Sequence, residues 1–212
     1  ADAFTLDKMR AMVERDERQI NSLIRLIEDM LDVSRIRTGK LSIRPTRFDL
    51  AHLVAGLVEN FSAQAAAAGS PIALDAETCV EGIWDEFRIE QVIANLLSNA
   101  LRYGAKRPIQ VRVLTEDGMA CVEVRDQGIG IDPQNQQRIF QQFERVATQQ
   151  SVAGLGLGLY ISEQIVLAHG GRILVNSAEG EGATFRVCLP LVCDMQGNAP
   201  ENESDREQAT SA

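Results

Sequence analysis

Two neighbouring stretches in which apolar residues recur at every second position most strongly constrain how this chain can fold. They are "PIQVRVLTED" at 108–117 and "MACVEVRD" at 119–126, and they meet at Asp117 and Gly118. A period of two is typical of a β-strand with one buried face, and an Asp-Gly pair favours a tight turn. The pattern therefore predicts a β-hairpin.

Other apolar patterns predict three helices and four further strands around this hairpin. The most amphipathic stretch begins near Asp85 and stops at Gly104, and Asp49 can cap an earlier helix. The expected helices cover 49–69, 85–104 and 159–170, and the expected strands cover 71–76, 80–85, 171–178 and 183–192. The segment 41–50 reads as an extended connection.

A long N-terminal helix is predicted from a three-four alternation of apolar residues, which ends near Gly39. Asp16 alone breaks the register, and the stripe is as narrow as a coiled-coil seam. We favour an intermolecular bundle over packing on the chain's own domain. The seam consists of Leu6, Met9, Val13, Ile20, Leu23, Ile27 and Met30.

The composition excludes several classes of function. The 212 residues carry a formal net charge of -9, which opposes binding to nucleic-acid phosphates. With 45% hydrophobic residues and no apolar run of membrane-span length, no membrane contact is expected from this part of the protein. The N-terminus lacks the pattern of a secretory signal, so we expect a cytoplasmic location.

The four cysteines are far apart and form no CxxC pair, which argues against a zinc site or a disulfide scaffold. We interpret them as reduced thiols, with Cys121 and Cys188 packed inside strands. The other two are Cys79 and Cys193.

The stretch "GLGLGLYI", Gly154 to Ile161, opens the helix at 159–170. A Walker loop requires a Lys where this sequence has Leu159, and the Rossmann spacing also fails. Glycines at a helix N-terminus expose N–H groups that favour an anion such as an oligophosphate. The alternative is that these glycines only allow close packing.

A second glycine pair follows the hairpin, where Asp126 ends a strand and Gly128 and Gly130 come next. A carboxylate at this point can accept a hydrogen bond from the exocyclic amine of adenine, and the glycines let a flat ring approach the backbone. An ordinary β-turn explains the residues equally well.

Three carboxamides lie four residues apart on the helix at 85–104, namely Gln91, Asn95 and Asn99. A single Asn on a helix is usually just solvated. Two carboxamides one turn apart, beside a nucleotide candidate, can present oxygens to the Mg²⁺ that accompanies ATP phosphates.

Along the chain the helix with the paired Asn comes first, then the strand with Asp126 and its glycines, a loop and the glycine run. With the elements in this order, the chain resembles the catalytic part of a bacterial two-component sensor histidine kinase, from Ile20 to Leu191. "DEFRIEQVIANLLSNALRY" is similar to the family's N box, "VRDQGIGI" to its G1 box, "IFQQFERV" to its F box and "GLGLGLYISEQIVLAHGGRI" to its G2 box. "GEGATF" matches the entry to the family's last strand.

The resemblance implies a role for each candidate residue. Asp126 recognises the adenine amino group, aided by Thr184, and Asn99 is the principal Mg²⁺ ligand, with Asn95 beside it. These two Asn are also the expected catalytic residues. The remaining nucleotide contacts are Tyr103, Gly128, Gly130, Gly154, Leu155, Gly156, Leu157 and Gly158. Residues 132–153 form an ATP lid, which we expect to be a long mobile loop anchored by the packing of Phe140 and Phe143.

The fold that the resemblance implies is an α/β sandwich, a mixed sheet with helices on one face, preceded by a long coiled-coil-like helix. We expect three regions: 1–42 as the second helix of the dimerisation and phosphotransfer hairpin, 43–192 as the ATP-binding domain, and 193–212 as a disordered tail. The parent protein is expected to be a membrane-anchored homodimer.

The expected function is binding of ATP and Mg²⁺ and transfer of the γ-phosphoryl group to a histidine on a first bundle helix that this chain lacks, for relay to an aspartate of a response regulator. Neither His52 nor His169 lies in the family's acceptor context. Related gyrase-like ATPases have a Glu general base where this chain has Asn95, so transfer is favoured over hydrolysis. The alternatives are a sigma-factor-regulating serine kinase and a degenerate regulatory module without activity.

Overall fold

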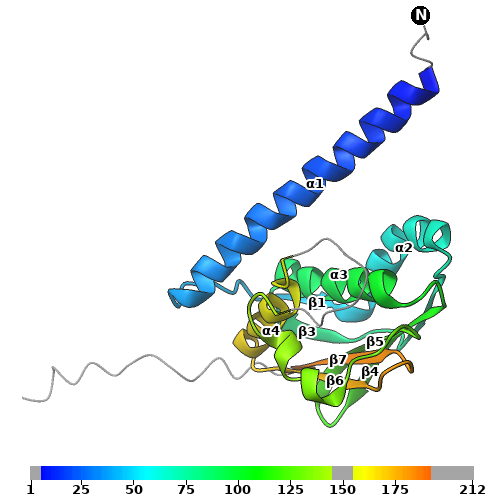
Figure 1. Ribbon diagram of the computed structural model, residues 1–212. Helices are drawn as coiled ribbons and strands as arrows, with labels where there is room; N and C mark the ends of the chain where they lie inside the picture. Colours follow the sequence, from blue (N-terminus) through cyan, green and yellow to red (C-terminus); the bar gives the residue numbers. More distant parts are fainter. Residues whose placement is uncertain (1–5, 145–154, 192–212) are drawn as a thin grey trace, which may run out of the picture.

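The computed structural model describes residues 6–144 and 155–191, which form a long helix followed by a two-layer domain (Figure 1). The helices are α1 (Leu6–Arg37), α2 (Leu50–Ala68), α3 (Glu86–Tyr103) and α4 (Gly158–Ala168). The strands are β1 (Thr46–Asp49), β2 (Ile72–Ala76), β3 (Glu81–Trp84), β4 (Ile109–Glu116), β5 (Met119–Arg125), β6 (Arg172–Ser177) and β7 (Ala183–Pro190).

The main sheet has five strands in the order β2-β4-β5-β7-β6. β2 pairs with β4 in parallel, and the other neighbours are antiparallel, so the sheet is mixed. α2, α3 and α4 lie on one face of it (Figure 1). The predicted α/β sandwich and its β-hairpin are therefore confirmed. The hairpin turns at Asp117 and Gly118, both with positive φ, as a two-residue turn between twisted strands requires.

The core lies between the sheet and the helices. The alternation in β4, β5 and β7 sends every second residue toward the helices, which cover this face of the sheet. Fully covered residues include Leu96, Leu97, Val111, Val122 and Val187. Each buried side chain of this size contributes about 1.5–3 kcal/mol.

The predicted N-caps of two helices are confirmed by their hydrogen bonds. The Asp49 carboxylate accepts a hydrogen bond from the N–H of Ala51 at 2.9 Å at the start of α2, and Asp85 accepts one from the N–H of Arg88 at 3.2 Å at the start of α3. Gly104 follows the last residue of α3, as predicted.

A second, two-stranded sheet was not predicted. β1 lies within the expected extended connection and pairs antiparallel with β3, so the predicted strand at 80–85 does not join the main sheet. Trp84 at the end of β3 is fully buried and donates a hydrogen bond from Nε1 to the carbonyl of Pro190 at 2.9 Å. This bond links the small sheet to the last strand of the main one.

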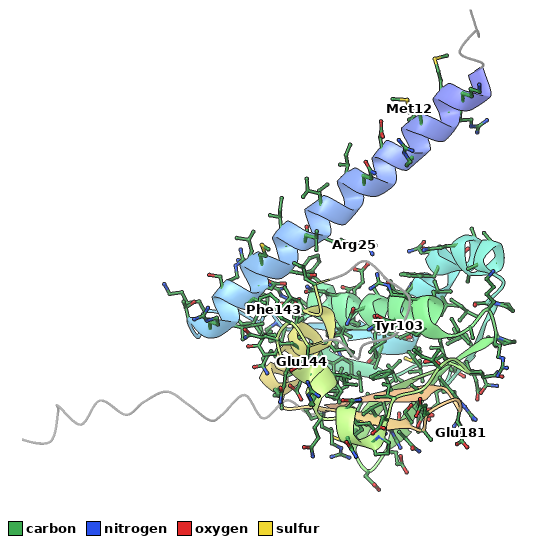
Figure 2. All side chains as sticks on the ribbon, in the orientation of Figure 1. Met12, Arg25, Tyr103, Phe143, Glu144 and Glu181 are labelled. Carbon is green, nitrogen blue, oxygen red and sulfur yellow. A yellow bond between two sulfur atoms is a disulfide. The ribbon has the colours of Figure 1, made fainter. Side chains whose placement is uncertain are left out.

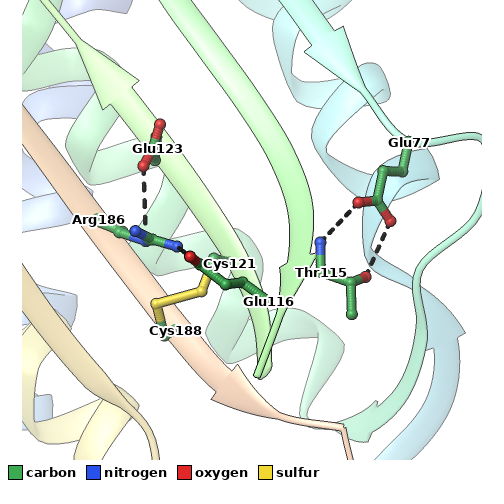
Figure 3. Close-up of a disulfide and its surroundings, with 7 residues drawn as sticks. All are labelled: Glu77, Thr115, Glu116, Cys121, Glu123, Arg186 and Cys188. Atoms are coloured by element: carbon green, nitrogen blue, oxygen red, sulfur yellow. Dashed lines mark hydrogen bonds and ion pairs between the residues drawn. A yellow bond between two sulfur atoms is a disulfide. The ribbon is translucent and has the colours of Figure 1, made fainter. Parts of the chain in front are cut away.

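The interpretation of Cys121 and Cys188 as reduced thiols is wrong for the structure as described, because they form a disulfide (Figure 3). They are direct partners in the register of β5 and β7, with Cα atoms 4.2 Å apart. Both belong to the side of the sheet that the helices leave free, beneath ion-paired side chains that include Arg186 and Glu123. Cys79 is a free, exposed thiol, and Cys193 lies outside the described residues.

The expected lid loop is partly regular where it is described. Short 3₁₀ turns cover Pro133–Asn135 and Arg138–Phe140, and residues 145–153 lie outside the described residues. Phe140 packs against the core as expected. Phe143 is 61% exposed at a φ of 61°, so its expected packing role is wrong.

α1 leaves most of its apolar seam exposed. Its N-terminal half extends away from the domain, and its C-terminal half lies close to α4 (Figure 1). The exposed apolar residues of α1 are Met9, Met12, Val13, Ile20, Leu23, Ile24, Ile27, Met30 and Leu31. Within the described part of the chain, no helix is both long and apolar enough to cross a membrane.

Candidate functional site

Asp126 is the central charged group of the candidate site, and only 5% of its surface is exposed. It directly follows β5, and its Oδ1 accepts hydrogen bonds from the N–H groups of Gly128 at 2.8 Å and Ala183 at 3.3 Å. No described residue donates to Oδ2. Burial raises the pKa of this carboxyl above its ordinary value, although the two N–H donors oppose the shift. The site therefore holds an acceptor oxygen that has no partner among the residues that the structure describes.

Glycines around Asp126 bring three backbone segments into close contact. A side chain at Gly128 would overlap the carbonyl of Tyr103, and one at Gly182 would overlap the carbonyl of Asp126. Gly130 has a φ of 68° and lies against the carbonyl of Ala178. Glycine is therefore required at these positions because the backbones are in contact there.

The N-terminus of α4 has the features of an anion site. Leu157 precedes the helix and provides no side-chain cap, so the N–H groups of the first turn receive no capping side chain from the described part of the chain. Gly156 has a φ of 71°, a conformation that favours glycine. The Leu155 and Leu157 side chains pack into the core, which leaves only their backbone for contact with a ligand. Gly154 lies outside the described residues.

Gly158 serves helix packing. A side chain there would overlap the amide oxygen of Asn95, whose Nδ2 donates a hydrogen bond to Ser162 Oγ at 3.0 Å. Asn95 thus fixes the first turn of α4 to the middle of α3. The alternative that the glycines only allow close packing is therefore correct for Gly158. Gly156 has a different role, because its positive φ is a backbone conformation that favours glycine.

Asn99 lies one turn after Asn95 on α3, is half-buried, and makes no side-chain hydrogen bond with any described residue. Tyr103 ends the helix one turn further on, and its carbonyl accepts a hydrogen bond from the N–H of Ile129 at 3.3 Å. Asn95, Asn99 and Tyr103 therefore follow one line along α3, from the start of α4 to the glycines beside Asp126.

α3 sets the distance between the two halves of the site. At one end Gly104 packs against the Cβ of Asp126, and nine residues earlier Asn95 contacts α4. At 1.5 Å per residue this separation is about 14 Å. A ligand with a base at Asp126 and phosphates at α4 would lie along this helix.

Thr184 is not brought to Asp126. It is the register partner of Arg125, and both side chains belong to the helix-free face of the sheet. There Thr184 lines a shallow hollow together with Gln110, Arg112, Glu123 and Arg125. The neighbouring Ala183 faces the helices and donates its N–H to Asp126. The expectation that Thr184 assists Asp126 is therefore wrong. Successive residues of a strand point to opposite faces of the sheet, and Ala183, one position earlier, is the residue on the side of Asp126.

Several residues of the candidate site were not identified from the sequence. Ala183 acts through its backbone, so no side-chain pattern indicates it, and Ser162 is one of many helix-surface hydroxyls. Gln91 has the spacing of a site residue but bonds to Asp32 and Arg88 instead. Gly182 was detectable as part of "GEGATF".

His169 is the buried C-terminal cap of α4. Its Nδ1 lies 2.8 Å from the carbonyl of Ile165, and its Nε2 accepts a hydrogen bond from the N–H of Asp85 at 3.0 Å. Burial lowers the pKa of this imidazole below its ordinary value. His52 lies on α2, away from these groups.

Among the described residues, no group of three or more His, Cys, Asp and Glu side chains could hold a metal ion. A cation here would need amide oxygens and the oxygens of a ligand, as Mg²⁺ accepts when it is bound with phosphates.

Comparison with known families gives one match that spans half of the chain. The sequence profile described as "Histidine kinase-, DNA gyrase B-, and HSP90-like ATPase" matches residues 84–192. This range includes α3, both glycine-rich segments and all the candidate residues above.

Curated relatives match a longer part of the chain. The circadian input-output histidine kinase CikA of Synechococcus elongatus is 34% identical over 176 residues, and the sensor histidine kinase RppB of Synechocystis sp. is 33% identical over 188 residues. These alignments cover 79% and 87% of this chain but only 23% and 41% of the relatives. The chain thus spans less than half of either relative.

Solved structures share the fold. ShkA in complex with AMPPNP superposes with a TM-score of 0.74 at 26% identity, covering 92% of this chain and 41% of that one. The histidine kinase AdeS of Acinetobacter baumannii superposes with a TM-score of 0.70 at 21% identity, covering 88% of this chain and 85% of that one. The sandwich fold therefore recurs in solved proteins.

Proposed function

This chain belongs to the histidine kinase-, DNA gyrase B- and HSP90-like ATPases, and from this premise we propose that it is the catalytic part of a sensor histidine kinase that binds ATP with Mg²⁺ and transfers the γ-phosphoryl group to a histidine. The observation that carries the proposal is the buried Asp126 carboxylate, one oxygen of which receives no hydrogen bond from any described residue. The exocyclic amine of adenine is a donor of the kind that this oxygen lacks.

The residues along α3 fit the rest of an ATP molecule. Asn99 has an uncommitted carboxamide whose oxygen would hold Mg²⁺, and Asn95, whose Nδ2 is used by Ser162, would offer its remaining Oδ1. The uncapped first turn of α4 would bind the phosphates through Gly156, Leu157 and Gly158, with Leu155 and Gly154 before it. When bound, Mg²⁺ neutralises charge on the phosphates.

Phosphoryl transfer is favoured over hydrolysis by the chemistry of Asn95. A hydrolase needs a general base to take a proton from the attacking water, and a carboxamide cannot do so. In transfer to an imidazole nitrogen, the acceptor is itself the nucleophile. This chain then needs only to orient the nucleotide and compensate its charge.

The wider assembly follows from the same proposal. Residues 1–42 would be the second helix of a dimerisation hairpin, 43–192 the ATP-binding domain and 193–212 a tail. The exposed seam of α1 would be covered by the first helix and the partner's hairpin in a homodimer. The receiver domain of a response regulator would accept the phosphoryl group next. The proposed location is the cytoplasm, within a membrane-anchored parent.

The experiment that tests the transfer step supplies the missing helix separately. A peptide with the first bundle helix of the parent protein, including its histidine, is incubated with this chain and γ-labelled ATP. We expect acid-labile, alkali-stable label on the peptide and none after replacement of its histidine by Ala. Label on serine, or ATP binding without any transfer, would contradict the histidine kinase assignment in favour of the serine kinase or the regulatory module.

A further inference from the structure

A buried polar cluster joins α1 to α3 outside the nucleotide site. Arg88 Nη1 donates to Asp32 Oδ2 at 2.8 Å and to Gln91 Oε1 at 2.9 Å, and Gln91 Nε2 donates to the same oxygen of Asp32 at 2.9 Å. Asp32 is only 4% exposed and Arg88 only 7%. Each of the three side chains thus bonds to the other two.

The cluster continues into the connection between α1 and the domain. Asp85, at the start of α3, accepts a hydrogen bond from the N–H of Arg44 at 2.8 Å and receives Arg88 N–H on its other oxygen. Its own N–H donates to His169 at the end of α4. The C-terminal ends of α1 and α4, the linker and the start of α3 therefore meet in one set of buried and partly buried hydrogen bonds.

The cluster occupies the side of α1 opposite to the exposed seam. At 100° per residue, the partly buried Val33 and Ile36 share the domain-facing side with Asp32, whereas Leu23 and Ile27 lie on roughly the other side. One side of α1 is thus available to other bundle helices while the other side holds the domain. In Figure 2, Met12 projects from the side of α1 that faces away from the domain, and Arg25 projects from the side near the domain.

We propose that Asp32, Arg88 and Gln91 are positioning residues that hold the nucleotide-binding domain on α1 in the orientation used for phosphoryl transfer. The inference rests on the function proposed above. A domain tethered only by the linker at 38–45 would sample many orientations, so a fixed one raises the effective concentration of the γ-phosphoryl group at the acceptor. Gln91 lies on the same face of α3 as Asn95 and Asn99. It would therefore hold the domain at the N-terminal end of this face, whereas the two Asn would serve the nucleotide further along.

The burial of the cluster makes it sensitive to single changes. Removing one member of a buried ion pair leaves the other charge buried without a partner, which is unfavourable. Because undocking of the domain from α1 would expose this charge to water, the substitution favours the undocked state. The nucleotide contacts begin one turn further along α3 and do not include these side chains. Loss of the cluster should therefore change the orientation of the domain without changing its affinity for ATP.

The test uses the complete kinase with its acceptor helix. For Asp32→Asn and Arg88→Gln, we expect the rate of phosphohistidine formation at saturating ATP to fall by about tenfold or more while the Kd for ATP stays within about twofold of the wild type. Gln91→Ala, which removes no charge, should show a smaller loss in the same direction. The matched control is Arg35→Gln, because Arg35 approaches Asp32 only to 3.6 Å and is 55% exposed.

A direct readout of orientation accompanies the kinetics. Nitroxide labels at the exposed Gln19 and Arg102 of one protomer, paired with an unlabelled partner protomer and in a background with Cys79→Ser and Cys193→Ser, report the distance between α1 and α3 by pulsed EPR. The wild type should give one narrow distance distribution, and Asp32→Asn a broad one.

Three results would overturn the inference. They are an unchanged or higher transfer rate in the charge variants, a loss of ATP affinity parallel to the loss of rate, and a narrow distance distribution in Asp32→Asn. A wild-type kinase that bound no ATP would instead contradict the proposed function, which makes the two failures distinguishable.

Discussion

At the scale of single residues, Asp126 combines a proposed role in adenine recognition with a cost in the folding stability of the domain. Asp126 is buried, and its pKa is raised because burial disfavours the charged form. A carboxyl with a raised folded-state pKa stabilises the fold at a pH below its unfolded pKa, and this contribution is lost as the pH rises through the folded value. Burial of the Asp126 carboxyl therefore costs the domain stability as the pH rises through that value, a cost that the proposed role in adenine binding would explain.

Asp126→Asn separates these two effects. The Asn Oδ1 can still accept from Gly128 and Ala183, but its NH₂ group replaces the acceptor that adenine needs. We expect ATP affinity to fall by about 10- to 100-fold, as for a lost hydrogen bond to a charged group. The free energy of unfolding at pH 7.5, from urea denaturation, should be equal to or higher than that of the wild type. A variant that bound ATP normally would refute the role of Asp126.

Gly158 offers a second test, directed at packing. Gly158→Ala should push Asn95 away from Ser162 and cost about 1 kcal/mol of unfolding free energy, the value of one hydrogen bond. In an Asn95→Ala background the same substitution should cost nothing, because the overlapping amide is gone. Equal costs in both backgrounds, measured by urea denaturation, would show that Gly158 is required for another reason.

At the scale of elements, local patterns predicted most of the domain. Asp49 and Asp85 begin α2 and α3 as expected, and the Asp117–Gly118 turn forms the hairpin, because caps and tight turns depend on residues close in sequence. The pairing of β1 with β3 depends on segments about 35 residues apart, which no local pattern encodes.

The candidate site shows the same division. Asp126 and the glycines could be recognised because their chemistry is local, whereas the error at Thr184 came from the unknown phase of a strand. The Cys121–Cys188 pair was missed because it depends on the register between β5 and β7. Gln91 lies on the same face of α3 as the two Asn, as its spacing indicated. Its partner Asp32 was not predicted, because it lies on α1, far away in the sequence.

The end of α4 gives a prediction for pH dependence. The pKa of His169 is lowered by burial, so its neutral form stabilises the fold above the unfolded pKa of about 6.5, and this stability is lost as the pH falls toward the folded value. The free energy of unfolding should therefore decrease between pH 7.5 and pH 5.5. His169→Gln should be less stable at pH 7.5 and show a flatter profile. An unchanged slope in this variant would assign the pH dependence to other groups.

At the scale of the whole molecule, the chain has two faces with separate tasks. The nucleotide site and the polar cluster lie on the domain side of α1, and the apolar seam lies on the other side. Apolar patches of this extent usually mark a protein interface. The proposed dimer would use the seam and leave the nucleotide site accessible.

This separation predicts that the seam can be changed without affecting the site. Leu23→Glu combined with Ile27→Glu should abolish dimerisation of the complete kinase in analytical ultracentrifugation, since two charges would enter an apolar bundle. ATP affinity should stay within about twofold, because neither residue contacts the domain. A large loss of ATP affinity in this variant would place the seam against the nucleotide domain.

The central claim is that this chain binds ATP along α3 with its base at Asp126, and calorimetric titration with ATP and GTP tests it most directly. Guanine carries a carbonyl where adenine carries its amine, so two acceptors would face each other at Asp126 Oδ2. We predict one-to-one binding of ATP that weakens when Mg²⁺ is removed, and no detectable binding of GTP at the same concentrations. Equal affinity for the two nucleotides, or no binding of ATP, would contradict the account.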